Sequence, residues 1–267
     1  KINKSAIQGI SETLNIDFRS PETLKDNDEE YKFIKELNAD LAIVVAYGQI
    51  IPEKFLNLTK KGFINIHASI LPKWRGAAPI QRSIMNLDSE IGISIMKIAK
   101  ELDSGPTSNI YKIELKKTDN ALDVSEKLSL LAAEKICDDI DNIFEDKVKF
   151  INQDHSKATY AKKIQKIEGL IDWNEDASKI IGKINGLFPS PSAFFNFSGE
   201  RHKILKAEIG NGAGNPGEVL SDKLEIACGN NQSIKILEIQ RQGKRPQKIS
   251  EFMLGSQIKK GFVLSNV

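Results

Sequence analysis

The stretch Leu41-Ala-Ile-Val-Val-Ala-Tyr-Gly48 is apolar at both odd and even positions and ends at a glycine. Apolar side chains on both faces are typical of a strand in a parallel sheet that helices cover on both sides. Before it, Ser20-Pro21-Glu22 places a proline near a helix start, and apolar residues then recur at helical spacing: Tyr31, Phe33, Ile34 and Leu37. We therefore predict a central strand over residues 41–48 and a preceding helix that ends by Asn38.

Further short apolar runs predict strands over residues 62–67, 92–98 and 108–115. A long segment that starts at Thr118, a good N-cap, carries one helical stripe: Val124, Leu128, Leu131, Ala132, Ile136 and Ile140. Short apolar runs that alternate with longer amphipathic segments are typical of strands joined by crossover helices. The first part of the chain is therefore predicted to be an α/β domain with a central, mostly parallel sheet.

The pattern changes after about residue 165. A helix is predicted over residues 176–187, followed by strands over 203–209, 217–220, 224–228 and 233–240, which favour a small antiparallel barrel. Gly212-Ala-Gly-Asn-Pro-Gly217 matches the glycine spacing of dinucleotide-binding loops but lies between predicted strands, so we interpret it as a flexible loop. We expect domains over residues 1–146 and 165–267, with a linker over 147–164.

Composition narrows the class of protein. The chain has 267 residues with 40% hydrophobic and 28% charged residues, which is typical of a globular protein and excludes general disorder. No apolar run approaches the roughly 20 residues of a membrane-spanning helix, so no membrane partner is expected. Two cysteines and three scattered histidines predict neither a disulfide framework nor a metal site, and favour the cytoplasm. The net charge of +2 is too small to indicate nucleic-acid binding by itself.

Polar residues that could take part in catalysis lie at the end of one predicted strand and in the turn between two others. Asn65 and His67 are two apart, so both side chains emerge on one face at the end of a buried strand. Asp103 begins a tight Asp-Ser-Gly turn between two other strands. Taken separately, the first two could be a structural hydrogen-bonded pair and the third only a turn residue. Together they supply a neutral donor, an imidazole and an anion, which suit acyl transfer to an amine without a covalent enzyme intermediate.

The segments Asn65–Pro72 and Leu102–Pro106 resemble the signature of the formyltransferases that use 10-formyltetrahydrofolate. Within that superfamily, Trp74-Arg-Gly-Ala-Ala-Pro-Ile-Gln-Arg82 is similar to the methionyl-tRNA formyltransferase branch. The resemblance covers nearly the whole chain, because it extends through four more segments: Val45–Gly48, Ile171–Trp173, Phe188–Pro191 and Gln242–Pro246.

The resemblance implies a Rossmann-like formyl-transfer domain followed by a barrel that resembles an OB-fold and contacts tRNA. It implies transfer of a formyl group from 10-formyltetrahydrofolate to the α-amino group of methionyl-initiator tRNA, and it favours a monomer. Family members open with a strand, a glycine-containing turn and a basic loop, none of which precedes Lys1, so we expect an amino-terminal segment to be missing. Glu101 stands where the family more often has glycine.

Carried over by residue, the resemblance implies that Asn65 binds the formyl oxygen and that His67 supplies a second donor or a proton. Asp103 would orient His67 and help to move the proton of the attacking amine. The folate side would be lined by Ser69, Ile70, Leu71 and Pro72. The alternative for Ile70 and Leu71 is that they only pack the loop.

Three cations and a tryptophan close to Asn65 and His67 in the chain could hold the acceptor end of tRNA. They are Lys73, Trp74, Arg75 and Arg82. Arg75 could equally anchor the loop. A second group has four cations and no acid within eight residues: Arg241, Lys244, Arg245 and Lys248. An ordinary solvated loop is the alternative there. We interpret Trp173 as a core or interdomain residue rather than a base-stacking platform.

Two other functions remain open from the sequence. A formyltransferase or formyl-folate hydrolase of the same fold could act on a small amine or on water. A binding module without turnover is the alternative from another class, because an absent first strand could leave the folate pocket unbuilt.

Overall fold

The computed structural model describes residues 4–265, which divide into two compact units on either side of the Phe63–Ile64 bond. The first unit contains α1 (Ala6–Thr13), α2 (Asp28–Glu36), β1 (Ala42–Val44) and α3 (Glu53–Leu56). Asn27 caps α2 through a hydrogen bond from Glu30 N, so the helix begins at Asp28 rather than near Pro21 as predicted. The strand predicted over residues 41–48 is reduced to β1.

The second unit opens with a sheet built from β2 (Phe63–His67), β4 (Glu90–Lys97) and β5 (Thr107–Glu114). β2 pairs antiparallel with β4, and β4 pairs antiparallel with β5. The prediction of a mostly parallel sheet is therefore wrong for these strands, although the α/β class is confirmed. Only residues 98–106 connect β4 to β5, and such a connection is shorter than the dozen or more residues that a parallel crossover needs.

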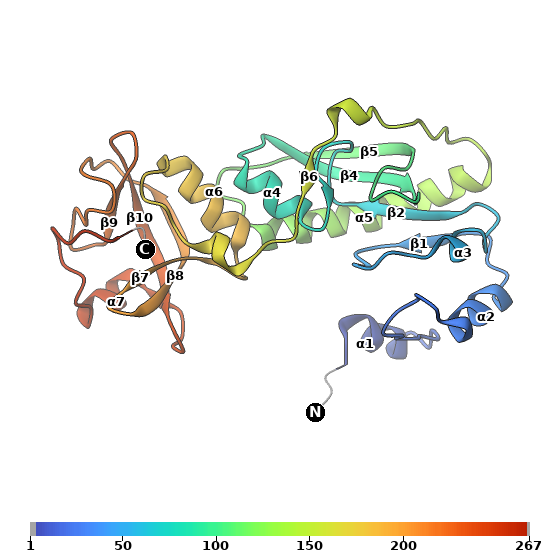
Figure 1. The fold of residues 1–267 in the computed structure, drawn as a ribbon, viewed down its shortest axis with the longest axis horizontal. Coiled ribbons are helices and arrows are strands. Elements are labelled where there is room, and N and C mark those ends of the chain that lie inside the picture. Colours follow the sequence, from blue (N-terminus) through green and yellow to red (C-terminus); the bar gives the residue numbers. More distant parts are fainter. Residues whose placement is uncertain (1–3, 266–267) are drawn as a thin grey trace. The chain divides into compact units, whose positions relative to one another are not determined.

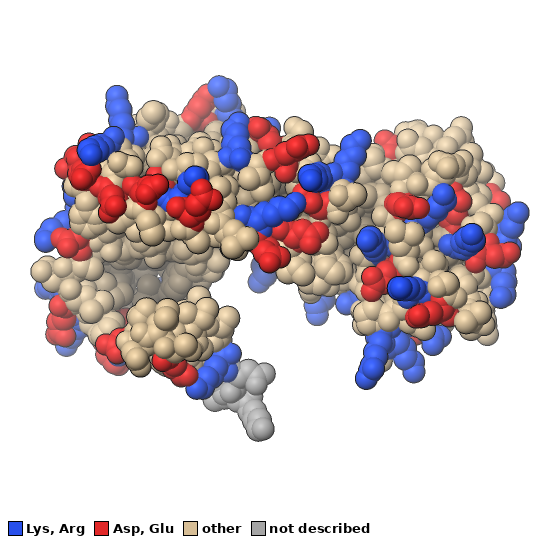
Figure 2. Space-filling model, turned by 180° about the vertical axis from the view of Figure 1, so that it is seen from behind, with Lys and Arg blue, Asp and Glu red and all other residues tan. Residues whose placement is uncertain are grey.

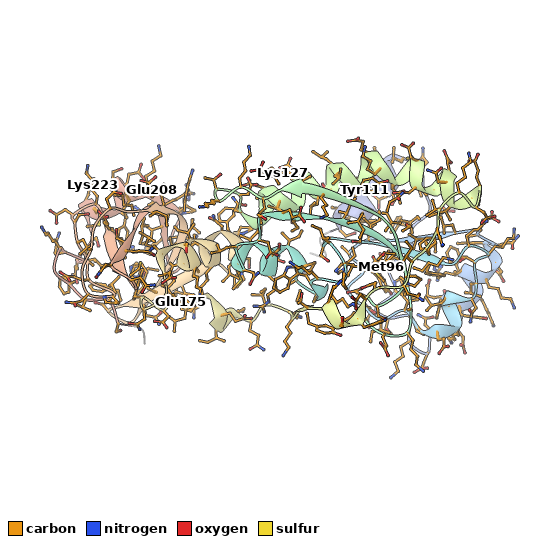
Figure 3. The ribbon with its side chains drawn as sticks, turned by 90° about the horizontal axis from the view of Figure 1, so that it is seen from above. Met96, Tyr111, Lys127, Glu175, Glu208 and Lys223 are labelled. Atoms are coloured by element: carbon orange, nitrogen blue, oxygen red, sulfur yellow. The ribbon has the colours of Figure 1, made fainter. Side chains whose placement is uncertain are left out.

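Helices α4 (Pro79–Met85) and α5 (Ala121–Phe144) cover one face of this sheet (Figure 1). Ile91 and Ile93 of β4 pack there against Val124 and Leu128 of α5. The hydroxyl of Tyr111 on β5 also donates to Asp139 of α5 at 3.1 Å, and its ring lies beside that helix (Figure 3). Asn120, rather than the predicted Thr118, caps α5, because its side chain accepts two backbone N–H groups of the first turn.

Residues 147–169 contain short elements only: η1 (His155–Lys157), β6 (Tyr160–Ala161) and η2 (Lys166–Gly169). β6 pairs in parallel with β3 (Arg75–Gly76), which lies in the loop after β2. This pairing brings the linker segment against the loop in which several site residues were predicted.

The remainder forms a curled antiparallel sheet with two helices. Its elements are α6 (Ala177–Leu187), β7 (Ala193–Phe197), β8 (Glu200–Ile209), β9 (Glu225–Cys228), β10 (Gln232–Arg241), β11 (Gln247–Lys248) and α7 (Ile249–Leu254). The strand order is β11-β10-β8-β7, and β9 also pairs with β10. The predicted small barrel is thus present as an open half-barrel. Trp173 is fully buried in its core, which confirms the interpretation as a core residue.

Candidate active site

Asn65 and His67 lie on the face of β2 that points away from α5. Ile66, between them, packs with the residues under α4 and α5, and side chains alternate along a strand. His67 is buried, whereas Asn65 is only partly so. Within residues 4–265, the Asn65 amide makes no side-chain hydrogen bond, so both its donors and its acceptor remain available to a ligand.

His67 lies between a carbonyl and a carboxylate. Its Nε2 is 2.9 Å from Trp74 O, and its Nδ1 is 3.7 Å from Asp103 Oδ2. A carbonyl oxygen only accepts, so Nε2 carries a proton in this contact. Asp103 therefore faces the other ring nitrogen, where it can stabilise a proton that arrives during a reaction.

Asp103 is positioned by the turn between β4 and β5. Its backbone has a φ of 47°, in the left-handed region, and its Oδ2 accepts the backbone N–H of Gly76 at 2.8 Å. The carboxylate is mostly buried, with 15% of the side chain exposed. Two distant segments thus converge at His67, as the sequence predicted.

The residues predicted to line the folate side belong to the loop directly after β2. Ser69 is fully buried and its hydroxyl donates to Lys73 O at 2.6 Å, so it holds the loop. Leu71 is also buried, and its N–H donates to Ser94 Oγ at 3.0 Å. Ile70 and Pro72 are partly exposed and are the two that a ligand can reach.

The residues predicted to hold the acceptor end have different environments. Lys73 is exposed. Trp74 is partly buried, and its indole N–H donates to Asp88 Oδ2 at 2.7 Å, which fixes the ring. Arg82 pairs with Glu168 at 2.6 Å, and its guanidinium holds the pKa of the Glu168 carboxyl below the ordinary value.

Arg75 does not face solvent. Only 2% of it is exposed, and its guanidinium donates to Gln153 Oε1 at 3.0 and 2.8 Å. A phosphate has no access to a guanidinium that is enclosed in this way. The predicted tRNA contact at Arg75 is therefore wrong, and the alternative of a loop anchor holds.

The second group of cations lies at the β10–β11 connection, in a different part of the fold from His67. Lys244, Arg245 and Lys248 are exposed, and Arg241 is partly buried at the end of β10. On the face shown in Figure 2, basic and acidic side chains are interspersed over most of the surface. Residues 241–248 hold four cations and no acidic residue, so this segment is more basic than the net charge of +2 for the whole chain indicates.

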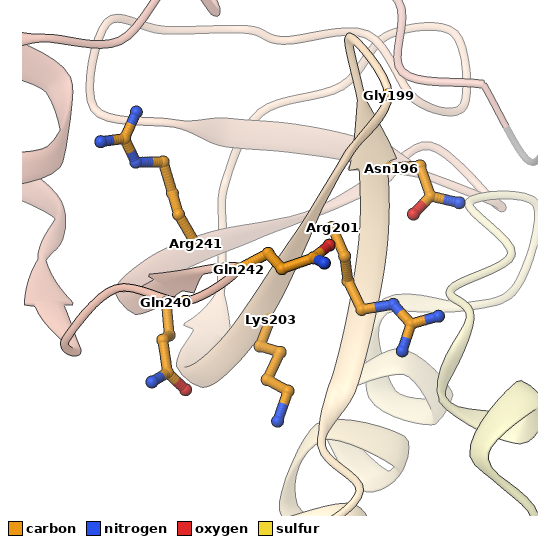
Figure 4. Close-up of a pocket in the computed structure, with 8 residues that line it drawn as sticks. Asn196, Gly199, Arg201, Lys203, Gln240, Arg241 and Gln242 are labelled. Atoms are coloured by element: carbon orange, nitrogen blue, oxygen red, sulfur yellow. The ribbon is translucent and has the colours of Figure 1, made fainter.

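Beside this group is a hollow of about 570 Å³ that no acidic residue lines. Its lining comprises Asn196, Gly199, Arg201, Lys203, Gln240, Arg241, Gln242 and Gly243. Arg201 and Lys203 project from the same face of β8, whereas Arg241 extends away from them (Figure 4). The sequence analysis did not single out the first two, because Arg201 precedes the strand predicted over residues 203–209 and lies on β8 only in the structure.

Two further expectations concern cofactors and membranes. Among the described residues, no group of three or more His, Cys, Asp or Glu side chains is arranged to hold a metal ion. No helix within residues 4–265 is long and apolar enough to cross a membrane.

The glycine-rich segment Gly212–Gly217 is a loop, as predicted. Its Gly212 N–H donates to Glu225 at 2.8 Å, so an internal carboxylate takes the place that a phosphate would have.

Comparisons with known proteins agree with this geometry. The family model described as "Formyl transferase" matches residues 6–140, and that described as "Formyl transferase, C-terminal domain" matches residues 163–257. The methionyl-tRNA formyltransferase of Pelagibacter ubique is 66% identical over 267 residues, which cover 100% of this chain and 86% of the relative. That of Bradyrhizobium diazoefficiens is 37% identical over 98% of this chain and 85% of its own length.

Solved structures share the fold at low sequence identity. WlaRD, a sugar 3N-formyl transferase crystallised with dTDP and 5-N-formyl-THF, superposes with a TM-score of 0.69 at 20% identity and covers 91% of this chain and 83% of its own. HypX from Aquifex aeolicus, in complex with tetrahydrofolic acid, gives 0.67 at 16% identity, over 88% of this chain and 42% of HypX. These likenesses establish the fold.

Proposed function

The chain belongs to the methionyl-tRNA formyltransferase family, and on that premise we propose that it transfers the formyl group of 10-formyltetrahydrofolate to the α-amino group of methionine on initiator tRNA. The observation that supports this most directly is the Asp103 carboxylate 3.7 Å from His67 Nδ1, beside the unengaged amide of Asn65. Bound folates in the WlaRD and HypX structures are consistent with a folate as formyl donor.

The three residues have separate roles in this proposal. The amine lone pair attacks the formyl carbon, and the Asn65 amide donates an N–H to the formyl oxygen as negative charge develops on it. A preorganised donor of this kind is worth about 3 to 4 kcal/mol of barrier. The bond between the formyl carbon and N10 of the folate then breaks. His67 and Asp103 together take the proton that the attacking amine loses and return it to the departing nitrogen.

The loop after β2 serves the folate side. Ile70 and Pro72, which are partly exposed, are proposed to contact the folate. Ser69 and Leu71 support them from beneath, because both are buried and bonded within the loop.

Two surfaces are proposed to bind the tRNA. Lys73, Trp74 and Arg82 are near the catalytic pair in the chain and suit the acceptor end. The exposed cations at the β10–β11 connection suit the phosphate backbone, and the hollow next to them adds Arg201 and Lys203 as candidates. Arg241, Lys244, Arg245 and Lys248 are the proposed contacts at that connection.

We propose the same division of the chain as the sequence predicted, with a catalytic domain over residues 1–146, a linker over 147–164 and a tRNA-contacting domain over 165–267. We expect a monomer, and we expect it in the cytoplasm, where translation begins.

A labelled-formyl assay tests the proposal. The protein is incubated with 10-formyltetrahydrofolate labelled in the formyl group and with methionyl-initiator tRNA, with free methionine, or with neither acceptor. We expect label to enter the aminoacyl end of the tRNA only. Release of labelled formate without acceptor, or transfer only to the free amino acid, would contradict the tRNA assignment.

A further inference from the structure

The turn that carries Asp103 is held by a side chain from the linker, Gln153, which no functional prediction includes. Gln153 is 7% exposed. Its Nε2 donates to two carbonyl oxygens of the turn, Asp103 O at 2.9 Å and Gly105 O at 2.7 Å. One buried amide group therefore satisfies two backbone acceptors on either side of Ser104.

The turn requires support from outside itself. Asp103 has a φ of 47°, a conformation that residues with a side chain adopt infrequently. The turn also has no room to relax toward β4, because a Cβ on Gly105 would lie 1.9 Å from Lys97 O. The position of the Asp103 carboxylate thus depends on the hydrogen bonds that hold this backbone, and Gln153 makes two of them.

Arg75, in the loop after β2, binds Gln153 from the other side. We call the hydrogen bonds that Arg75 and Gln153 make to each other and to the Asp103 turn the brace. Arg75 Nε and Nη2 donate to Gln153 Oε1, the opposite end of the same amide. Its Nη1 lies 3.3 Å from His155 Nδ1, and its backbone N–H donates to Thr159 O at 2.9 Å. Arg75 is thereby fixed to the linker segment at three places.

The hydrogen bonds form a closed circuit. Arg75 donates to Gln153, Gln153 donates to the backbone of Asp103, and the Asp103 carboxylate accepts the N–H of Gly76, the residue after Arg75. A closed circuit of buried hydrogen bonds fixes geometry more narrowly than separate bonds do. The Asp103 carboxylate, which belongs to this circuit, lies 3.7 Å from His67 Nδ1 through its Oδ2.

We infer that Gln153 and Arg75 are positioning residues for formyl transfer, which hold the Asp103 carboxylate in place beside His67. This inference rests on the catalytic role proposed for Asp103. Neither residue touches a substrate in this scheme. Their contribution is to keep a catalytic group in its productive position, and a displacement of about 1 Å can lower a rate roughly a hundredfold.

Two variants test the brace in the whole protein. Gln153→Met has a similar length but neither donates nor accepts. Gln153→Glu keeps acceptor oxygens for Arg75 and sets them against the carbonyls of Asp103 and Gly105, and it carries the test if the methionine variant does not fold. For both we expect kcat to fall about 10- to 100-fold, while KM for methionyl-tRNA and for the folate changes less than about threefold. Gln257→Met, in a segment outside the site, is the matched control and should keep wild-type kcat.

A double-mutant cycle separates positioning from general stability. If Gln153 acts through Asp103, then Gln153→Met should cost less than about threefold in kcat when Asp103 is already asparagine. An equal cost in both backgrounds, or a rise in KM at unchanged kcat, would overturn the brace. Full activity of Asp103→Asn by itself would instead overturn the catalytic role proposed for Asp103. The two failures are therefore distinguishable.

Discussion

Gly76 donates its backbone N–H to Asp103 Oδ2 at 2.8 Å, and this bond ties the loop after β2 to the turn between β4 and β5. The carboxylate thus makes two contacts, since it accepts the Gly76 N–H and faces His67 Nδ1. An asparagine side chain keeps an oxygen that can accept the same N–H but carries no charge. Substitution by asparagine therefore separates the structural tie from the electrostatic role.

For Asp103→Asn we expect kcat to fall about a hundredfold or more, because the anion that stabilises a proton on His67 is removed. The pH–rate profile should also change, since the negative charge that faces His67 Nδ1 is removed. Steady-state formylation of methionyl-tRNA between about pH 5.5 and 9 measures both effects. A variant with near-normal kcat would contradict the role of the carboxylate.

Asn65→Ala removes the amide that we propose to bind the formyl oxygen. Because that bond strengthens as charge develops, kcat should fall about a hundredfold while the folate dissociation constant changes little. Turnover is measured as above, and folate affinity by fluorescence quenching or calorimetry. Asn109→Ala is a control for removal of an amide in the same sheet, since Asn109 bonds to Asp139 and not to the site. A weaker folate affinity at unchanged kcat would assign Asn65 to binding only.

Local patterns in the sequence were sufficient to predict the positions of several strands. β2, β4 and β5 were predicted within two residues of their bounds, because a continuous or alternating apolar run depends only on neighbouring residues. Strand direction was not predictable in this way, because it depends on how the connections run. The helix starts at Asp28 and Ala121 were also missed, since asparagines at positions 27 and 120 act as caps where a proline and a threonine were expected to mark the start.

The candidate site shows the same limit. The convergence of His67 and Asp103 was predicted from motif and strand position. The burial of Arg75 was not, because its partner Gln153 lies 78 residues away and nothing local marks the two as neighbours. A basic residue in a loop has the same local sequence pattern whether it binds phosphate or anchors the loop.

Charge removal tests the second tRNA surface. We expect the combined change of Lys244, Arg245 and Lys248 to alanine to weaken tRNA binding and to lower the slope of log Kd against log salt by about one for each of these cations that binds a phosphate. Filter binding over a series of salt concentrations measures the slope. The matched control is the combined change of Lys223, Lys259 and Lys260, which are exposed cations elsewhere in the same domain. Equal slopes for both triple variants would assign the β10–β11 cations to solvent.

The packing of α4 on α6 depends on two glycines, Gly182 and Gly186. A Cβ on Gly186 would lie 2.9 Å from the backbone oxygen of Gln81, which cannot move aside as a flexible side chain could. Gly186→Ala should therefore destabilise the protein by about 1 to 3 kcal/mol, as measured by urea unfolding. Gly9→Ala in α1, where a Cβ meets nothing within 4 Å, is the matched control and should be neutral or slightly stabilising. An equal free energy of unfolding for both variants would contradict the prediction that close packing of α4 on α6 requires a glycine at position 186.

His202 is 3% exposed in the core of the half-barrel and stacks on Phe195 with ring centroids 5.2 Å apart. Burial lowers the pKa of its imidazole below the ordinary value of 6.5. The unfolded chain therefore binds a proton more readily than the folded one, so the associated stability is complete above about pH 6.5 and is lost as the pH falls toward the lowered folded-state pKa.

The variant His202→Phe removes this titration and keeps a ring in the stack. We expect the wild-type free energy of unfolding to fall more steeply between about pH 7.5 and 5 than that of the variant, because only the wild-type protein must exclude a proton from this ring in order to stay folded. Urea titrations at each pH measure both slopes. Carboxylates contribute to both proteins and cancel in the difference, so identical pH slopes would show that His202 does not titrate in this range.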